Sequence, residues 1–197
     1  MRGTIITLIA LIPFLSVAQE ISVEKINIDL KQSKLEWTGK KLGGEHYGEI
    51  QLSSGHLSFT KNKLSGGSFE MDMASITCAD ITDQKSNKRL VDHLKSEDFF
   101  SVVRFPKSSF VITKVEPTSA TEYTVTGNLT IKGKTNPITF TAKVNSINNQ
   151  MVAEATLTFD RSKYDVKFGS QSFFENLGEK LVYDDVDMIV KLVMLSK

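Results

Sequence analysis

At 197 residues the chain is long enough for one domain with a full hydrophobic core, and its 40% hydrophobic content excludes a wholly disordered protein. The 24 basic and 23 acidic residues nearly cancel, so the sequence lacks the positive charge that nucleic-acid binding requires. It also lacks a basic cluster that would hold it on an anionic membrane surface. The single cysteine, Cys78, cannot form an internal disulfide, so folding depends on the core alone.

The first 18 residues have the features of a secretory signal peptide. Arg2 supplies the positive start, residues 5–15 form an apolar run too short to span a bilayer stably, and Ser16 to Ala18 are small enough for a signal peptidase. We expect cleavage near Ala18 and residues 19–197 to form a single domain in the periplasm or outside the cell. Removal of Arg2 leaves 23 basic and 23 acidic residues. No stable membrane insertion is expected.

Apolar and polar residues alternate along most of the remaining chain. The clearest segments are residues 35–40, 55–62, 68–75, 123–133, 138–144, 151–160 and 186–195. Alternation gives each strand one dry and one wet face, which is typical of antiparallel sheets. Glycine- and asparagine-rich breaks at residues 64–69, 132–137 and 145–150 indicate turns. About eight such strands predict an all-β protein, either an eight-stranded antiparallel up-and-down barrel or a two-sheet sandwich.

Residues 83–103 interrupt the strands. The run NKRLVDHLK places its apolar residues at helical spacing, and Ser96 with the acidic residues after it predicts the start of a second short helical turn. Phe99 and Phe100 leave that turn in different directions, so at least one of them must meet another apolar surface. This insert fits best at one opening of a barrel, where it covers the dry interior.

Few residues in the sequence suggest catalysis or metal binding. His46, His56 and His93 lie on different predicted elements without a close ligand pair, so no metal site is expected, and no local histidine activates Cys78 as a nucleophile. Arg161 either forms an ion pair with the neighbouring Asp160 or faces the phosphate or carboxylate of a ligand.

The apolar inventory leaves two interpretations open. Twelve phenylalanines and six methionines accompany one tryptophan, and most lie on the predicted dry faces. Such residues fill a packed core, but they also suit an adaptable tunnel for a flexible chain.

An ordered series of motifs resembles the YceI-like family of secreted lipid- or polyisoprenoid-binding proteins. The series includes LEWTGKKLGGEHYGEI, RLVDHLKSEDFFSVVRFPKSSF, GNLTIKGKTNPITF and FDRSKYDVKFGS, and the resemblance covers residues 27–195. It implies a lipocalin-like barrel with a helical insert near one opening and an apolar tunnel for a polyisoprenoid, an isoprenoid quinone or a fatty-acid derivative. No cofactor and no catalytic residue is implied.

The resemblance and the alternation together define the predicted ligand contacts. The apolar contacts are Trp37, Phe59, Phe69, Met71, Met73, Leu94, Phe99, Phe100, Phe110, Ile112, Val125, Leu129, Phe140, Phe159 and Met188. His93, Arg161 and Tyr164 are the candidates for contacts with a polar head group. Two alternatives stay open: an enzyme or enzyme accessory that uses His93, Asp160 or Arg161, and a packed barrel that binds a partner on its surface. A homodimer is a candidate assembly.

Overall fold

The computed structural model describes residues 22–148 and 150–195, so the predicted signal peptide at residues 1–18 lies outside the described residues. The strands are β1 (Val23–Asn27), β2 (Lys34–Lys41), β3 (Gly44–Thr60), β4 (Lys63–Asp72), β5 (Lys107–Pro117), β6 (Glu122–Ile131), β7 (Lys134–Ile147), β8 (Gln150–Asp160) and β9 (Val182–Val193). The helix is α1 (Gln84–Lys95), and the 3-10 turns are η1 (Met73–Ser75), η2 (Arg161–Tyr164) and η3 (Gly178–Lys180).

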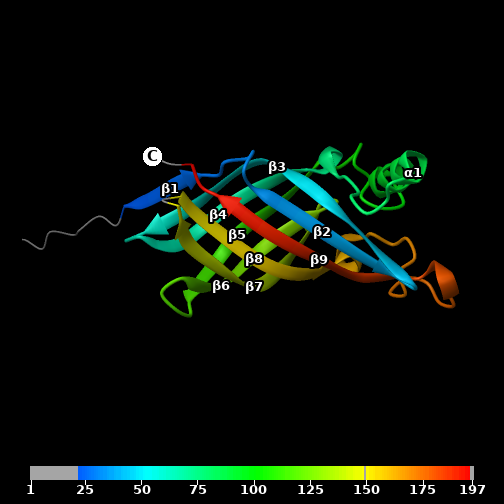
Figure 1. Cartoon of the computed structure of the whole chain (residues 1–197). Coiled ribbons are helices and arrows are strands. Elements are labelled where there is room, and N and C mark those ends of the chain that lie inside the picture. The colour runs from blue at the N-terminus through cyan, green and yellow to red at the C-terminus, as the bar shows by residue number, and fades with distance from the viewer. Residues whose placement is uncertain (1–21, 149, 196–197) are drawn as a thin grey trace, which may run out of the picture.

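Eight strands close into an antiparallel barrel (Figure 1). Their order is β3-β2-β9-β8-β7-β6-β5-β4, and the pairing of β4 with β3 completes the ring. The predicted eight-stranded barrel is therefore confirmed. The additional strand β1 pairs with the end of β3, from Val23↔Thr60 to Asn27↔His56. Not every pair runs the full length of its strands: the ladder between β7 and β8 extends only from Ala142↔Ala155 to Ile147↔Gln150.

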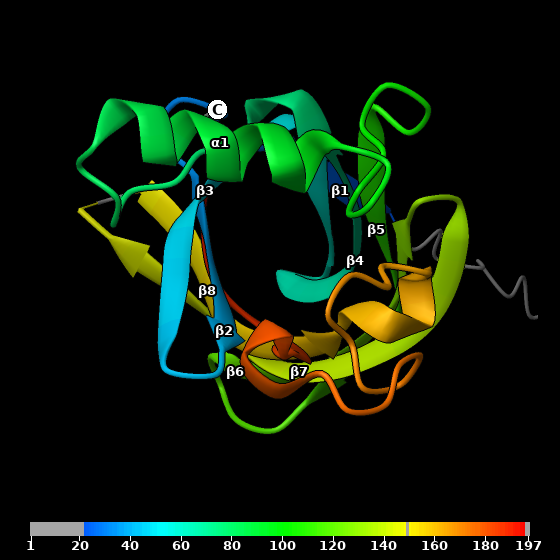
Figure 2. The same cartoon turned by 90° about the vertical axis from the view of Figure 1, so that its right-hand side faces the viewer.

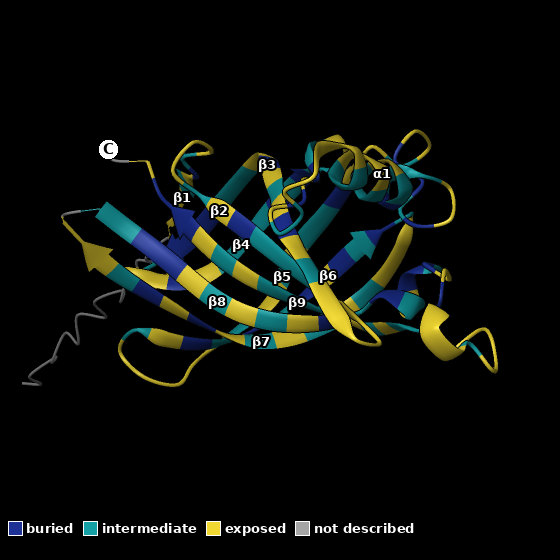
Figure 3. Ribbon diagram, turned by 45° about the vertical axis from the view of Figure 1, so that its right-hand side comes forward, coloured by how far each residue is buried: buried dark blue, intermediate teal, exposed yellow. Residues whose placement is uncertain are grey.

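The predicted alternation is visible as bands of buried and exposed residues along the strands (Figure 3). In β6 the odd-numbered residues from Tyr123 to Ile131 are all buried, whereas the even-numbered ones are half-buried or exposed. Because successive side chains of a strand point to opposite faces, the odd-numbered residues line the barrel interior. The same holds for Phe69 and Met71 in β4.

The strand β3 departs from simple alternation. It is 17 residues long, and its register with β4 shifts between Leu52 and Ser54. This β-bulge adds one residue, so the buried positions change from even-numbered Leu52 to odd-numbered Leu57. The turn predicted at residues 64–69 is wrong: these residues lie within β4, and the chain turns at Lys61 and Asn62, which both have positive φ. A side chain at Gly67 would be crowded within the strand, because an added Cβ would lie 2.9 Å from the His56 carbonyl oxygen and 3.0 Å from Leu57 Cδ2.

The helix α1 lies across one end of the barrel (Figure 2), as the sequence predicted. It begins at Asp83, whose side chain accepts a 2.9 Å hydrogen bond from the Ser86 amide. A short turn follows at residues 97–100, where the Phe99 amide donates to the Ser96 carbonyl at 3.2 Å, but the predicted capping of this turn by the Ser96 side chain is wrong. Ser96 instead ends α1, because its hydroxyl donates to the His93 carbonyl at 2.7 Å, and irregular turns follow. No helix in the described part of the chain is long and apolar enough to cross a membrane.

The two ends of the barrel differ. We call the mouth the end at which the β2–β3 turn, α1 and residues 161–181 lie (Figure 1). The opposite, far end is closed by buried side chains, including Ile28, Phe59, Tyr123 and Met194. Ile28 and Met194 form a bridge between the segments that follow β1 and β9. The far end is thus packed core, and any opening lies at the mouth.

The alternation makes a stability prediction. Val125, 1% exposed, faces inward on β6, and Asn128 on the same strand faces outward. Val125→Asp buries a carboxylate without a partner, so we expect it to lower the free energy of unfolding by about 3 kcal/mol or more. Asn128→Asp should change it by less than about 0.5 kcal/mol. Urea denaturation measures both, and equal effects would contradict the strand register.

Candidate functional site

A cavity of about 370 Å³ occupies the barrel interior. This volume lies within the range of about 300–1,000 Å³ that is usual for small-molecule sites. All eight barrel strands contribute mostly apolar residues to its wall, and α1 adds Leu90, His93 and Leu94. The exposed residues Lys41 and Tyr183 also belong to the wall, so the cavity reaches the surface at the mouth. The interior is therefore not packed solid.

The structure brings most of the predicted contacts together on this wall. Phe59 is the one predicted apolar contact that does not line the cavity. The others do: Trp37, Phe69, Met71, Met73, Leu94, Phe99, Phe100, Phe110, Ile112, Val125, Leu129, Phe140, Phe159 and Met188. Of the head-group candidates, His93 and Arg161 line the cavity and Tyr164 does not.

Phe59 and Tyr164 are buried elsewhere. Phe59 pairs with Glu24 of β1 and Leu64 of β4, so it packs into the closed far end. Tyr164, 1% exposed, packs edge-on against Phe159 with ring centroids 5.8 Å apart. Burial, together with the nearby Asp160 carboxylate, raises the pKa of Tyr164 to about 12, so its hydroxyl stays protonated at neutral pH.

Two inward-facing glycines keep large rings against the wall. Gly55 lies opposite Phe69, and a Cβ added at Gly55 would be 2.7 Å from Phe69 Cδ1. A Cβ at Gly127 would likewise overlap the Phe110 ring. Because each ring occupies the space over a glycine, it lies along the wall instead of extending across the lumen. These contacts explain how a wall rich in phenylalanine leaves a cavity open.

An aromatic cluster closes part of the mouth. The His93 ring of α1 meets Phe99 at 5.0 Å and Phe168 at 4.5 Å between centroids, both edge-on. Phe99 and Phe168 are 5.3 Å apart, and all three residues line the cavity together with Phe100. The insert therefore contributes both phenylalanines to the wall, and Phe168 meets them from the segment between β8 and β9.

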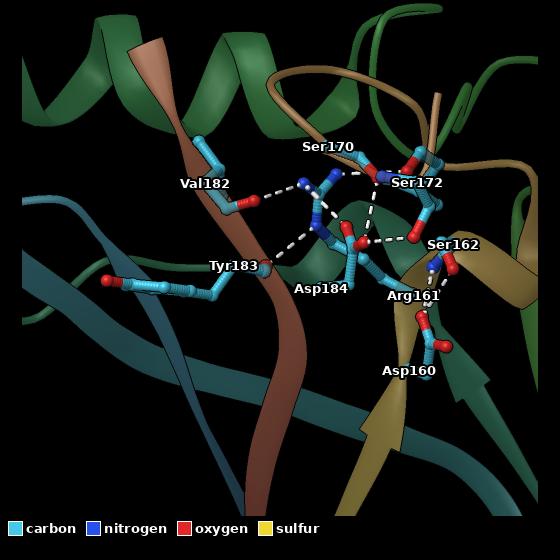
Figure 4. A network of polar contacts seen from close by, with 9 residues as sticks. Asp160, Arg161, Ser162, Ser170, Ser172, Val182, Tyr183 and Asp184 are labelled. Atoms are coloured by element: carbon cyan, nitrogen blue, oxygen red, sulfur yellow. Dashed lines mark hydrogen bonds and ion pairs between the residues drawn. The ribbon is translucent and has the colours of Figure 1, made fainter. Parts of the chain in front are cut away.

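Arg161 anchors that segment (Figure 4). Its guanidinium donates to the carbonyls of Val166 and Val182 at 2.9 Å and of Tyr183 at 3.1 Å. Its Nη2 also lies 3.3 Å from Asp184 Oδ1 in an ion pair, and Arg161 is 2% exposed. Burial lowers the pKa of Arg161, and Asp184 acts in the opposite direction. These contacts tie η2 to the start of β9.

Of the two interpretations of Arg161, the ion pair with the neighbouring Asp160 does not form, because Arg161 pairs with Asp184. The Asp160 carboxylate caps η2, accepting hydrogen bonds from the Ser162 amide at 2.9 Å and the Ser162 hydroxyl at 2.6 Å. Strand pairing explains the change of partner, because Asp160 of β8 lies opposite Asp185 of β9. Arg161 consequently lies beside Asp184, whose Oδ2 accepts from the hydroxyls of Ser170 and Ser172.

His46 lines the cavity although it is not among the predicted ligand contacts. Its Nδ1 lies 2.8 Å from Asp80 Oδ2, and its side chain is 27% exposed. Burial tends to raise the pKa of Asp80, but hydrogen bonds from His46, the Tyr47 amide and Cys78 outweigh it and lower the pKa to about 2. The even-numbered spacing of His46 with Ile50 and Leu52 is the signal that could have identified it.

The remaining polar groups do not form a metal site. Within residues 22–148 and 150–195, no three His, Cys, Asp or Glu side chains are arranged to hold a metal ion. Lys40, on the wall, donates to Asp187 at 2.7 Å, and this bond raises the pKa of Lys40. The site offers an apolar chamber with a polar mouth.

Known proteins share this architecture. A model of the YceI-like domain matches residues 26–194. The chain belongs to the YceI-like domain family. The resemblance inferred from the sequence motifs is therefore confirmed, and it covers the whole barrel.

Three known proteins show how far the likeness extends. A UPF0312 protein of Pseudomonas putida is 28% identical over 133 residues, which cover 66% of this chain and 67% of that protein. The crystal structure of Burkholderia cenocepacia BcnA matches with a TM-score of 0.69 and 26% identity, covering 84% of this chain and 98% of that one. A polyisoprenoid binding domain from Saccharophagus degradans has a TM-score of 0.63 at 10% identity, over 90% and 100% of the two chains. At that identity the last match shows the fold alone.

The Arg161 contacts predict a large stability effect at the mouth. Arg161→Gln leaves Asp184 without its buried cation, so we expect a loss of about 3–5 kcal/mol in the free energy of unfolding. Lys163→Gln, which alters an exposed 4.0 Å pair with Asp160, should cost less than about 1 kcal/mol. Urea denaturation of both variants measures the difference, and a loss below 1 kcal/mol for Arg161→Gln would contradict the anchoring role.

The low pKa of Asp80 predicts a pH dependence. Because the pKa is about 2 in the folded protein and 3.8 ordinarily, the ionised Asp80 stabilises the fold above pH 3.8, and this contribution is lost as the pH falls toward 2. The difference in unfolding free energy between the native protein and Asp80→Asn should shrink by about 2 kcal/mol between about pH 5 and pH 2. Urea denaturation at each pH tests this, and a constant difference would refute it.

Proposed function

We propose that this YceI-like protein binds one long-chain amphiphile, such as a polyisoprenoid, an isoprenoid quinone or a fatty-acid derivative, inside the barrel. The observation that carries the proposal is the apolar cavity of about 370 Å³ beneath α1. The polyisoprenoid binding domain of Saccharophagus degradans has the same fold, which supports a lipid ligand. We further propose transport, storage or sequestration of that lipid in the cell envelope, with the mature protein in the periplasm or secreted.

The energetics of an apolar tail are sufficient for binding. Each buried carbon contributes about 0.8 kcal/mol, so one five-carbon prenyl unit contributes about 4 kcal/mol. Association costs about 4–15 kcal/mol, so the tail contribution exceeds this cost after a few buried units. The wall offers such a tail apolar contacts from Phe69, Met71, Phe110, Phe140 and Met188. Binding therefore requires no strong polar contact.

The residues of the enzyme alternative have other partners. Arg161 is occupied by three carbonyls and Asp184, and Asp160 caps η2. His93 packs between Phe99 and Phe168, with Asp98 3.7 Å from its Nε2. These contacts favour binding over catalysis as the role of the site.

Organic extraction of the purified protein, followed by mass spectrometry, tests the function directly. We expect one long-chain lipid per protein. Trp37, the only tryptophan, lines the cavity, so titration with a prenyl or acyl chain should also change its fluorescence. Trp37→Phe is the control for the signal. A protein that is empty after purification and also takes up no prenyl or acyl chain would refute the proposal.

Blocking the lumen should abolish uptake. Ala155 of β8 lines the cavity, whereas its neighbour Thr156 is exposed on the outer face. Ala155→Phe places a ring in the chamber, so we expect at least a tenfold weaker affinity for a long chain. Thr156→Phe should leave the affinity unchanged. Trp37 fluorescence measures the affinity and urea denaturation verifies folding; equal affinities in two folded variants would argue against binding in the lumen.

A further inference from the structure

The pair of His46 and Asp80 places one free polar atom on the cavity wall. His46 of β3 lies directly opposite Gly39 of β2, and both residues line the cavity. Gly39 has no side chain to cover the imidazole. Nδ1 of His46 is 2.8 Å from Asp80 Oδ2, and within the described residues Nε2 has no hydrogen-bond partner. Nε2 is thus the ring nitrogen left for a ligand.

The partner of Nδ1 determines which ring nitrogen carries the proton. The lowered pKa of Asp80, about 2, keeps its carboxylate ionised at neutral pH, and an ionised carboxylate only accepts hydrogen bonds. In neutral His46, Nδ1 must therefore carry the hydrogen that is donated to Asp80. Nε2 then has a lone pair and acts as an acceptor.

The orientation of Asp80 is itself fixed. Its other oxygen, Oδ1, accepts from the Tyr47 amide at 3.0 Å and from Cys78 Sγ at 3.2 Å. The segment that carries Asp80 is bound along β3, because the amides of Thr77 and Ala79 donate to the carbonyls of Glu49 and Tyr47. The acceptor on the wall is consequently held in place before any ligand arrives.

We propose that His46 Nε2 accepts a hydrogen bond from a hydroxyl group of the bound amphiphile, so that the cavity selects long-chain alcohols over ethers of the same chain. This inference rests on the proposed function and specifies its ligand class. A ligand without a donor would cover Nε2 and leave it without water or a partner, which weakens binding. An alcohol meets the same atom with its hydroxyl hydrogen while its chain fills the apolar wall.

The basic groups on the wall favour an anionic head group less strongly than His46 favours a hydroxyl group, because they have other partners or are exposed to water. Lys40 is bonded to Asp187, and Arg161 to Asp184 and three carbonyls. His93 lies between two phenylalanine rings. Lys41, on the wall, is exposed, so water competes for its charge. The His46 acceptor is a polar contact on the wall whose orientation is fixed by a second side chain, Asp80.

Titration with geranylgeraniol and with geranylgeranyl methyl ether, followed by Trp37 fluorescence, tests the selection. We expect the alcohol to bind about five- to tenfold more tightly, as one additional hydrogen bond implies. His46→Leu should remove this preference: binding of the alcohol should weaken, and binding of the ether should not weaken but strengthen, because the ligand no longer covers an acceptor that has no partner. His56→Leu is the matched control, because His56 does not line the cavity, and it should keep the native preference.

Asp80→Asn provides a second, independent readout. The Tyr47 amide and Cys78 hold the oxygen of the new amide at the Oδ1 position, so its NH₂ group faces Nδ1 and donates to it. His46 then carries its hydrogen on Nε2 and becomes a donor toward the lumen. The ether, an acceptor, should gain about five- to tenfold in affinity, and the imidazole ¹⁵N shifts should exchange. A purely structural role of Asp80 would not strengthen binding of any ligand.

The outcomes separate the inference from the proposed function. If the native protein binds alcohol and ether equally, and His46→Leu changes neither, the selection by His46 is refuted while lipid binding stands. If the folded Asp80→Asn variant does not bind the ether more tightly than the native protein does, the tautomer mechanism is refuted. If the native protein takes up neither chain, lipid binding itself fails.

Discussion

The closed ring of eight hydrogen-bonded strands is the constraint on which the rest of the molecule depends. Closure fixes a lumen whose width follows from the number of strands, and alternation lines that lumen with apolar side chains. Those side chains do not fill it, because rings such as Phe69 and Phe110 lie over Gly55 and Gly127. The result is a chamber of about 370 Å³ that has an apolar wall and reaches the surface at the mouth.

The two ends of the barrel are built differently. The far end is closed by packed core, with Phe59 among its buried side chains. The mouth carries the Arg161–Asp184 ion pair, the His93 ring and the His46–Asp80 pair, and its segments are bonded to one another. Arg161 ties η2 to β9, and Asn87 of α1 donates to the carbonyls of Cys78 and Ile81 at 2.9 Å. The side chain of His46 therefore faces the chamber from a rigid frame.

Alternation was sufficient to predict most of the wall but not its polar geometry. Residues such as Val125 and Phe140 could be assigned to the interior by parity within a single strand, and the structure agrees. Parity shows that Phe59 faces inward, but it does not show at which height along the barrel axis the residue lies. The sequence therefore could not show that Phe59 belongs to the closed far end and not to the cavity wall. The partner of Arg161 depends on the register between β8 and β9, and His46 meets Asp80 34 residues away in sequence. The pattern of residues within one strand predicts neither of these contacts between separate segments.

The short ladder between β7 and β8 has a mechanical consequence. Their pairing stops at Ala142↔Ala155, so the halves of these strands nearer the mouth diverge and form a seam in the barrel wall. Across it, the Asn136 side chain donates to the Lys163 carbonyl at 3.0 Å. Moving these halves apart would break this one hydrogen bond but no strand ladder, so the barrel wall is least constrained beside Phe140. If the barrel takes up an amphiphile, this seam is where its wall can widen while the fully paired far end keeps its shape.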